Sequence, residues 1–349
     1  MASKFGGIML SPFEQVYRKR DYDFVAYNDA RFQYSGHWQE RPDQTLNLGF
    51  GRGSSIHWNG PGRDVLFLVM RHPWSGTISV DEDPSRTENL CSLCTYTDAI
   101  LANSLTIVGK PVISQGEELI IYGAFVPRTA LNDSQSETSS FDEERFRSVQ
   151  TDQVDRWIRN IIETGQDIEE ITLKRRDAYL MRWRETEPYV NRGAKVLDIG
   201  CGNFLPGMLE YFEKADFTYT GLDIDERVID GNIGKTQGRL NFNFLRASNE
   251  KLPCLDDEFD FVFSSHSLEH SSDLESSFNE IMRVLKPGGW LFFAVPLDVD
   301  NAPEHLWIIS PEIWKRLPSV AGFSLRNVHI GDIYPEIGYD MVVVAQKPK

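Results

Sequence analysis

The sequence has no apolar run long enough to cross a membrane. A membrane-spanning helix needs about 18–20 consecutive apolar residues, and every apolar run in these 349 residues is shorter. The first ten residues, MASKFGGIML, contain neither a long apolar core nor a small-residue cleavage site, so we expect no signal peptide. We therefore predict a cytoplasmic protein with no membrane partner.

Cysteine and basic residues are also scarce. The chain has four cysteines, and Cys91-Ser-Leu-Cys94 has metal-ligand spacing without a second pair or matching histidines nearby. We therefore expect no metal site. The 36 basic residues are outnumbered by 52 acidic residues, which gives a net charge of −16. Such a surface repels phosphate backbones and argues against a nucleic-acid partner.

The patterns that are present divide the chain in two. Residues 1–130 hold short β-branched and aromatic segments separated by Gly, Pro, Asn and Asp, which predicts an all-β, sandwich-like domain. The polar, acidic stretch 131–144 is typical of a linker. Residues 145–349 begin with a helical lead-in and then alternate apolar strands with helical stretches, which predicts a parallel sheet covered on both faces.

The predicted strands of the first domain are 45–50, 54–58, 64–70, 76–82, 104–109 and 118–126. In the second domain the last two predicted strands, 323–330 and 341–347, are joined by a short connection. That connection cannot hold a helical crossover, so we expect these two strands to pair antiparallel.

Two carboxylates stand at the ends of the first two predicted strands of the second domain. Asp198 ends the strand in VLDIGCG, with Gly200 and Gly202 directly after it, and Asp223 ends the strand in GLDID. In open α/β sheets, ligands bind beyond the carboxyl ends of the strands, where the strand order reverses. Two acids there favour a ligand with a cationic end and a ribose diol over a diphosphate. Leu205 also breaks the dinucleotide fingerprint G-x-G-x-x-G, because it occupies the place of the third glycine.

These and later segments resemble the class I S-adenosylmethionine (SAM)-dependent methyltransferases of the type 11 kind. The resemblance covers about 195–347 and rests on VLDIGCG, GLDID, NEKLPCLDDEFDFVFSSHSLEHSSD and EIMRVLKPGGWLFFAVP. It implies a Rossmann-like α/β domain with a seven-stranded sheet, and SAM as the cofactor. The chain departs from the family motif at Phe204, which stands at the third glycine, so its ring must turn away from the cofactor or narrow the pocket.

The resemblance also implies which residues hold the cofactor. Gly200 and Gly202 would pass under its methionine part, with Asp198 near the amino group, and Asp223 would bind the ribose hydroxyls. The other implied positions are Ser248 and Asn249 beside the adenine, and Ser265 and His266 facing the methionine end.

Methyl transfer from a sulfonium is an in-line displacement, in which the protein aligns the acceptor and removes a proton. A hydroxyl acceptor needs a general base with a pKa near the working pH, and histidine is the usual choice. Two histidines on predicted strand-tip loops are therefore the catalytic candidates, His305 beside Glu304 and, second, His270. We predict O-methylation of a small-molecule or carbohydrate acceptor.

Residues 35–126 loosely resemble galactose-binding-like β-sandwich modules, on the segments GHWQE, FGRGSSIHWNG and SGTISVDED. Such a module would tether a glycan acceptor near the active site, and Trp38, Trp58 and Trp74 could stack on sugar rings or belong to the core. The domain could equally form a homo-oligomer interface or a lid.

Two other functions stay open at this point. Phe204 favours a non-catalytic binding protein with a degenerate methyltransferase-like domain, whereas the retained acids and glycines oppose it. A nicotinamide-dependent oxidoreductase is disfavoured by Leu205.

Overall fold

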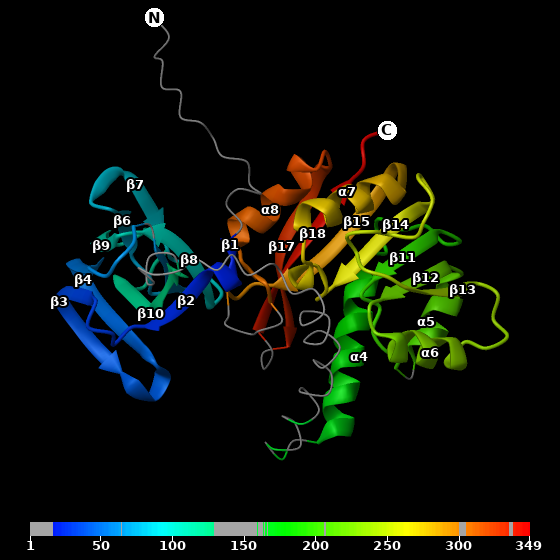
Figure 1. Ribbon diagram of the computed structural model, residues 1–349, viewed down its shortest axis with the longest axis horizontal. Coiled ribbons are helices and arrows are strands. Elements are labelled where there is room, and N and C mark those ends of the chain that lie inside the picture. Colours follow the sequence, from blue (N-terminus) through cyan, green and yellow to red (C-terminus); the bar gives the residue numbers. More distant parts are fainter. Residues whose placement is uncertain are drawn as a thin grey trace, which may run out of the picture.

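The structure is a computed structural model that describes residues 17–63, 65–128, 167–205, 207–299, 305–334 and 338–349, together with residues 159, 163 and 165. Within these residues a β-rich domain and an α/β domain lie side by side (Figure 1). The expected fold class is thereby confirmed. The predicted linker 131–144 lies outside the described residues, so the linker and the domain boundaries beside it stay predictions.

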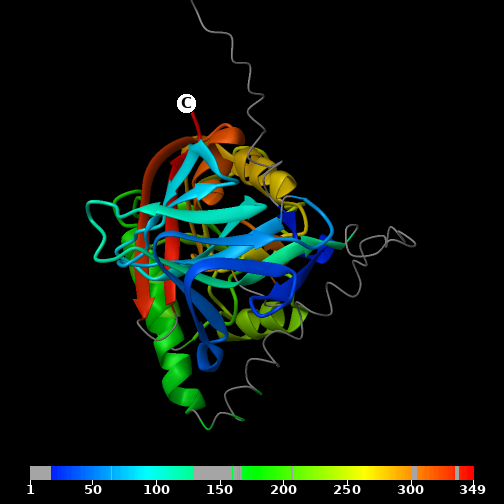
Figure 2. The same cartoon turned by 90° about the vertical axis from the view of Figure 1, so that its left-hand side faces the viewer.

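The described strands of the first domain form one antiparallel sheet with the order β7-β6-β9-β4-β10-β5-β8, to which β2 and β3 are added at β10 and β4. Figure 2 views the molecule from this side, with the curved sheet in front. The strands are β2 (Tyr22–Ala26), β3 (Phe32–Arg41), β4 (Leu46–Trp58), β5 (Val65–Arg71), β6 (Thr77–Val80), β7 (Asp83–Asn89), β8 (Tyr96–Ala102), β9 (Ser104–Gly109) and β10 (Glu118–Pro127).

Strand β4 explains how one sheet encloses a core. Its first half pairs with β10 and its second half with β9, so the sheet divides there into two wings. Both wings contribute to a single apolar cluster, in which Phe67 and Ile121 of one wing and Ile78 and Ile107 of the other are fully buried. The predicted segments 45–50 and 54–58 belong to this one strand, and a bulge in the pairing with β3 separates them.

The second domain is a seven-stranded sheet with the order β13-β12-β11-β14-β15-β18-β17. All neighbours are parallel except those of β18, which runs antiparallel to β15 and β17, as the short connection predicted. Its strands are β11 (Lys195–Ile199), β12 (Thr218–Asp223), β13 (Phe242–Arg246), β14 (Phe259–Ser265), β15 (Leu285–Pro296), β17 (Ser324–Tyr334) and β18 (Gly338–Gln346). Within this domain the chain begins at β11 and adds β12 and β13 on one side of it. The chain then returns to the opposite side of β11 at β14, so the strand order reverses between β11 and β14.

Helices cover both faces of this sheet (Figure 1). Alternate residues of a strand point to opposite faces, so Val196 packs with one group of helices and Leu197 with the other. The helices are α4 (Ile168–Glu185), α5 (Met208–Ala215) and α6 (Glu226–Lys235) on one face, and α7 (Leu274–Val284) and α8 (Pro311–Val320) on the other. The short 3-10 helix η4 (Leu268–His270) also belongs to this domain, whereas η2 (Lys19–Asp21) and η3 (Pro42–Gln44) belong to the β domain. Among the described helices, none has the length and apolar character needed to cross a membrane.

The two domains touch through backbone, polar and apolar contacts. The short strand β1 (Tyr17–Arg18) pairs antiparallel with β16 (Trp307–Ile308). Thr97 of β8 donates from its backbone N–H and its hydroxyl to Asp298 Oδ1, at 2.8 Å and 3.2 Å. Val299 and Ile308 are buried against side chains of the β domain. The segments on both sides of residues 300–304 are therefore held by the first domain.

An ion pair lies deep in the second domain. Arg182 of α4 and Asp340 of β18 are almost completely buried, and Arg182 Nη2 lies 3.2 Å from Asp340 Oδ2. The same guanidinium contacts Glu185 Oε1 at 2.5 Å. Breaking a buried ion pair leaves an uncompensated charge inside the protein, which costs far more than losing a surface pair.

We expect Arg182→Ala to lower the free energy of unfolding by about 3–5 kcal/mol, because the buried Asp340 loses its guanidinium partner and keeps only the imidazole of His266. The matched control is Arg192→Ala, which removes a largely exposed pair with Asp216 and should change stability by less than about 0.5 kcal/mol. Urea denaturation followed by tryptophan fluorescence measures both variants. Equal midpoints would show that the buried pair contributes no more than the exposed one.

Candidate functional site

The carboxyl ends of β11 and β12 meet at the point where the strand order reverses. Asp198 of β11 pairs in register with Gly221 of β12, two residues before Asp223. The backbone N–H groups of Gly200 and Cys201 both donate to Leu222 O, at 2.7 Å and 3.0 Å. The loop after β11 therefore folds across the end of β12. The predicted arrangement of two acids at neighbouring strand ends is confirmed.

Asp198 is completely buried between two tyrosines. Tyr219 Oη donates to Asp198 Oδ2 at 2.5 Å, and Tyr179 of α4 donates to the same oxygen. Asp198 Oδ1 has no hydrogen-bond partner among the described residues. Burial and, to a smaller extent, the nearby charge of Asp223 raise the pKa of Asp198 to about 7, against the opposing effect of the two tyrosine hydroxyls. This carboxyl group therefore has an acceptor oxygen left over and a pKa near neutrality.

The glycines after Asp198 leave the backbone bare. Gly200 has a φ of +73°, and a Cβ atom there would lie 2.4 Å from the hydroxyl of Ser267, so only glycine fits. Gly202 has a φ of +55°, and a Cβ atom there would meet nothing within 4 Å. Open space over a backbone of this kind is what close approach of a ligand requires.

Asp223 is held in place by the same loop. Its Oδ2 accepts from the backbone N–H of Gly202 at 3.1 Å and its Oδ1 from that of Asp225 at 2.9 Å. Each carboxylate oxygen can accept a further hydrogen bond, and the residue is half-buried. Burial raises the pKa of Asp223 despite these two bonds.

The loop after β13 reaches the same place. Ala247 N–H donates to Asp223 O at 3.1 Å, which brings the following residues, Ser248 and Asn249, beside this acid. Asn249 is buried, whereas Ser248 is half-buried and accepts from Glu250 N–H at 3.3 Å. The structure thus brings together six predicted cofactor residues: Asp198, Gly200, Gly202, Asp223, Ser248 and Asn249.

Phe204 turns its ring into the core. Its side chain is 3% exposed, and its ring centre lies 5.3–5.5 Å from those of Phe212, Tyr219 and Phe244. Its backbone N–H donates to Asn232 Oδ1 at 2.8 Å. Of the two outcomes expected from the sequence, the ring turning away is therefore the one observed, and the feature that favoured a degenerate domain has a structural role.

The end of β14 carries the last two predicted cofactor residues. Ser265 is half-buried, and His266 has a φ of +53° while its backbone N–H donates to Ala294 O at 2.9 Å. His266 Nε2 lies 3.0 Å from Asp340 Oδ2. The side chain of His266 is 39% exposed, and the charge and the hydrogen bond of Asp340 raise its pKa. His266 therefore connects the ion pair of Arg182 and Asp340 to the end of β14. The sequence position of His266 gave no sign of its contact with Asp340.

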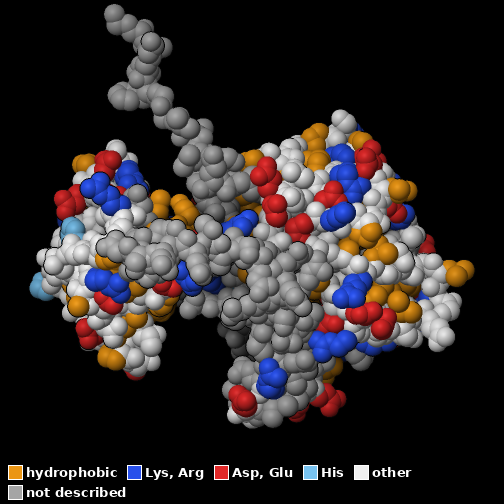
Figure 3. All heavy atoms as spheres, in the orientation of Figure 1, with side chains coloured by type: hydrophobic (Ala, Val, Ile, Leu, Met, Phe, Trp, Pro, Cys, Tyr) orange, Lys and Arg blue, Asp and Glu red, His pale blue; other side chains and the backbone are white. Residues whose placement is uncertain are grey.

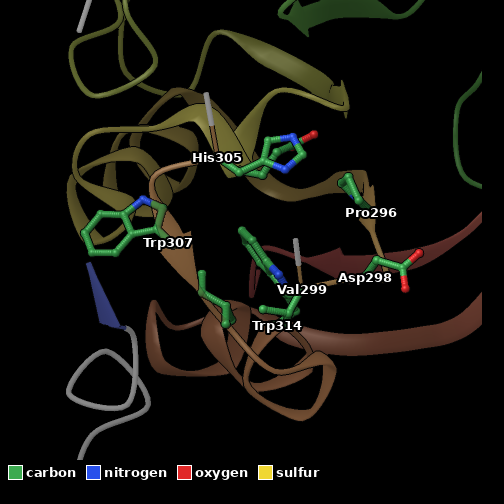
Figure 4. Close-up of a pocket in the computed structure, with 8 residues that line it drawn as sticks. Pro296, Asp298, Val299, His305, Trp307 and Trp314 are labelled. Atoms are coloured by element: carbon green, nitrogen blue, oxygen red, sulfur yellow. The ribbon is translucent and has the colours of Figure 1, made fainter. Parts of the chain in front are cut away.

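A pocket lies beside these strand ends (Figure 4). His305 stands opposite Trp314, with Trp307 and Asp298 at the two ends. The pocket is lined by Glu269, Pro296, Asp298, Val299, His305, Trp307, Ile309 and Trp314. His270 lies next to His305, with ring centres 5.0 Å apart, so the two catalytic candidates come together. Glu304, expected to orient His305, lies outside the described residues.

Sequence reasoning missed several residues of this region. Tyr179 and Tyr219 surround Asp198, yet each sits in an apolar pattern typical of core residues. Glu269 precedes a predicted catalytic histidine, which was the one available sign of its role. Asp340 opens an apolar strand, and a single acid at a strand end carries no motif.

In a comparison with known protein families, residues 197–293 match the family described as "Methyltransferase domain". The chain is 35% identical over 103 residues to the sterol 24-C-methyltransferase ERG6B of Gibberella zeae, which covers 29% of this chain and 27% of that protein. It is 31% identical over 104 residues to the ubiquinone biosynthesis O-methyltransferase of Hydrogenovibrio crunogenus, covering 28% of this chain and 41% of that protein. The chain thus spans less than half the length of either curated relative.

Among solved structures, the chain is similar to 1,6-didemethyltoxoflavin-N1-methyltransferase of Burkholderia thailandensis. The TM-score is 0.45 at 16% sequence identity, and the match covers 62% of this chain and 94% of that one. That structure contains bound 1,6-didemethyltoxoflavin and S-adenosylhomocysteine.

The raised pKa of Asp198 predicts a pH-dependent stability. Between pH 4 and about 7 the unfolded chain ionises this carboxyl group while the folded protein keeps it protonated. Folding then takes up a proton, so the free energy of unfolding should fall by up to about 1.4 kcal/mol per pH unit as pH rises through this window. Asp198→Asn removes the titrating group and should flatten this part of the profile. Urea denaturation of both proteins from pH 4 to pH 8 measures the difference, and parallel profiles would contradict the buried, protonated carboxyl.

Proposed function

We propose that this chain, whose residues 197–293 belong to the methyltransferase domain family, uses SAM to methylate a hydroxyl group of a small-molecule acceptor. The observation that carries the proposal is the pair of carboxylates at the ends of β11 and β12, joined by bare glycine backbone, in a domain that also holds a pocket lined by His305. Such an arrangement suits a positively charged nucleoside. Burial deprives both carboxylates of hydration, and an adjacent positive charge compensates for that loss.

The residues present fit this cofactor. Asp223 keeps acceptor capacity for the two ribose hydroxyls, and Gly202 leaves the space above it open. Asp198 Oδ1 has no hydrogen-bond partner among the described residues and is the proposed acceptor for the ammonium group, which would have to enter the buried surroundings of this oxygen. When bound, SAM supplies an electrophilic methyl group attached to a sulfonium.

The pocket supplies the acceptor side of the reaction. Trp307, Trp314 and Ile309 give it flat apolar walls, on which an aromatic, sterol-like or sugar ring can pack. The imidazole of His305, with His270 beside it, is placed to accept the proton of an acceptor hydroxyl. The names of two relatives, a sterol methyltransferase and a ubiquinone biosynthesis O-methyltransferase, support a small-molecule acceptor that contains a ring.

The β domain, we propose, positions the acceptor pocket. Asp298 and Val299 line the pocket and contact Thr97, while the guanidinium of Arg18 lies 5.2 Å from the ring centre of Trp307. These contacts fix two walls of the pocket from outside the α/β domain.

A carbohydrate acceptor and a sugar-binding β domain are the finer form of this proposal. Trp58 is buried in the core, and Trp38 packs against Tyr34 with ring centres 4.7 Å apart. Trp74 is 46% exposed, so a sugar-stacking surface would be built around this residue. On the face shown in Figure 3, acidic and basic side chains are interspersed, a pattern that suits uncharged acceptors better than nucleic acid.

Asp223→Ala should weaken binding of S-adenosylhomocysteine, the demethylated cofactor, by about 100-fold or more, because two hydrogen bonds to a charged acceptor are lost. Isothermal titration calorimetry measures this directly. The matched control is Asp230→Ala, an exposed acid on α6, which should bind like the parent. If the parent binds neither SAM nor its demethylated product, or Asp223→Ala binds as the parent does, the proposed cofactor site is wrong.

Turnover tests the acceptor chemistry. The parent should transfer a radiolabelled methyl group from SAM to at least one member of a panel of phenols, sterols and sugars. His305→Ala should lower the rate constant by about 10²–10⁴-fold, the usual contribution of a general base, with cofactor affinity unchanged. His329→Ala is the control, because that histidine pairs with Glu185 away from the pocket. An unchanged rate in His305→Ala would exclude His305 from the chemistry.

A further inference from the structure

Three metal-ligand side chains meet at the pocket. Glu269 and His270 lie in η4, and His305 comes from the segment just before β16. One ligand atom of each residue lies within 4.8 Å of the others. The rings of His270 and His305 have centres 5.0 Å apart, and Glu269 and His305 both line the cavity. The fold thus brings the neighbouring side chains of Glu269 and His270 together with that of His305, which comes from a segment distant in the sequence.

Glu269 supplies an independent sign of a ligand. Its side chain is 7% exposed, yet neither of its carboxylate oxygens has a hydrogen-bond partner among the described residues. Its Oε1 lies 3.7 Å from His266 Nδ1 and 3.9 Å from His270 Nε2, and both distances exceed the 2.7–2.9 Å of a charge-assisted hydrogen bond. A buried carboxylate that is left unsatisfied is costly. A cation at this point would satisfy it.

We propose that Glu269, His270 and His305 bind a divalent transition-metal ion, and that Zn²⁺ is the ion their donor set fits best. Two histidines and one glutamate form a known ligand set of catalytic zinc, with a further position left open. Imidazole donors disfavour Mg²⁺ and Ca²⁺, which prefer oxygen ligands. Tetrahedral zinc with bonds of about 2.1 Å places its ligand atoms about 3.4 Å apart. The observed ligand atoms lie within 4.8 Å of one another, so binding an ion would require the side chains to move closer together.

The residues behind Glu269 can orient it. His266 lies between Glu269 and Asp340, and Asp340 is paired with Arg182. Such outer partners hold metal ligands in position in many metal sites. The open coordination position would face the pocket between Trp307 and Trp314, where Figure 4 shows His305 directed toward the cavity.

The role of the metal ion rests on the proposed function, whereas its binding does not. An acceptor hydroxyl that coordinates the ion loses its proton more readily, as zinc-bound water does. The O–H bond breaks, water takes the proton, and the electron pair stays on the oxygen that the ion holds. His270 and His305 then act as ligands and need not accept the proton themselves.

The direct test is zinc binding by the full-length protein after treatment with a chelator. Isothermal titration calorimetry with Zn²⁺ alone should give one tight equivalent per chain, checked by elemental analysis. Glu269→Gln and His305→Ala should each weaken binding by about 100-fold or more, since even outer-shell partners contribute 10–100-fold. Circular dichroism establishes that both variants are folded, and Glu269→Gln keeps the size of the side chain.

Two controls isolate the cluster. The double variant Cys91→Ser/Cys94→Ser should bind zinc as the parent does. This result would show that the zinc is not bound by the Cys-x-x-Cys pair. His329→Ala should also leave binding unchanged, since this histidine pairs with Glu185. Absence of a tight equivalent in the parent, or equal binding by Glu269→Gln, would overturn the proposal. Binding of Mg²⁺ in preference to Zn²⁺ would overturn the choice of ion.

A separate titration with S-adenosylhomocysteine keeps the two proposals distinguishable. Zinc binding without cofactor binding would support the metal site and refute the proposed function, and the reverse result would refute the metal site alone. Turnover should disappear after chelation and return with Zn²⁺. Turnover that survives complete metal removal would overturn the role of the ion and leave the histidines as bases.

Discussion

The candidate site depends on a carboxyl group that is kept out of water at the middle of the sheet. Asp198 ends the central strand β11, and its position is determined by Tyr179 from one helix and Tyr219 from the next strand. Burying a charge costs energy unless the charge is paired, so the pKa of this carboxyl group is raised to about 7. A cationic ligand is the partner that would resolve this cost, which links the packing of the core to the choice of cofactor.

A second set of buried charges connects the far side of the domain to the pocket. Arg182 of α4 pairs with Asp340 of β18, and Asp340 contacts His266 at the end of β14. His266 in turn lies beside Glu269, which lines the pocket. Polar groups in a low-dielectric interior strengthen one another only when each is satisfied. Glu269 is the member of this network whose oxygens have no hydrogen-bond partner among the described residues. A ligand bound to Glu269 would therefore form the most favourable new interactions.

The β domain contributes to the site without supplying its chemistry. Its contacts concentrate on the segments around β16 and on Asp298, which are the same segments that line the pocket. Contacts that hold these segments in place before an acceptor binds lower the conformational entropy lost on binding. In the proposed function, this is how the β domain would assist the acceptor pocket.

The sequence by itself determined the periodic features: the alternating strands and helices, the antiparallel last strand and the acids at two neighbouring strand ends. These follow from local rules, since strand spacing and short connections restrict the topology. It did not determine the direction of the Phe204 ring, the tyrosines around Asp198 or the meeting of Glu269, His270 and His305. Those depend on contacts between segments distant in the chain, which only the packed tertiary structure brings within reach.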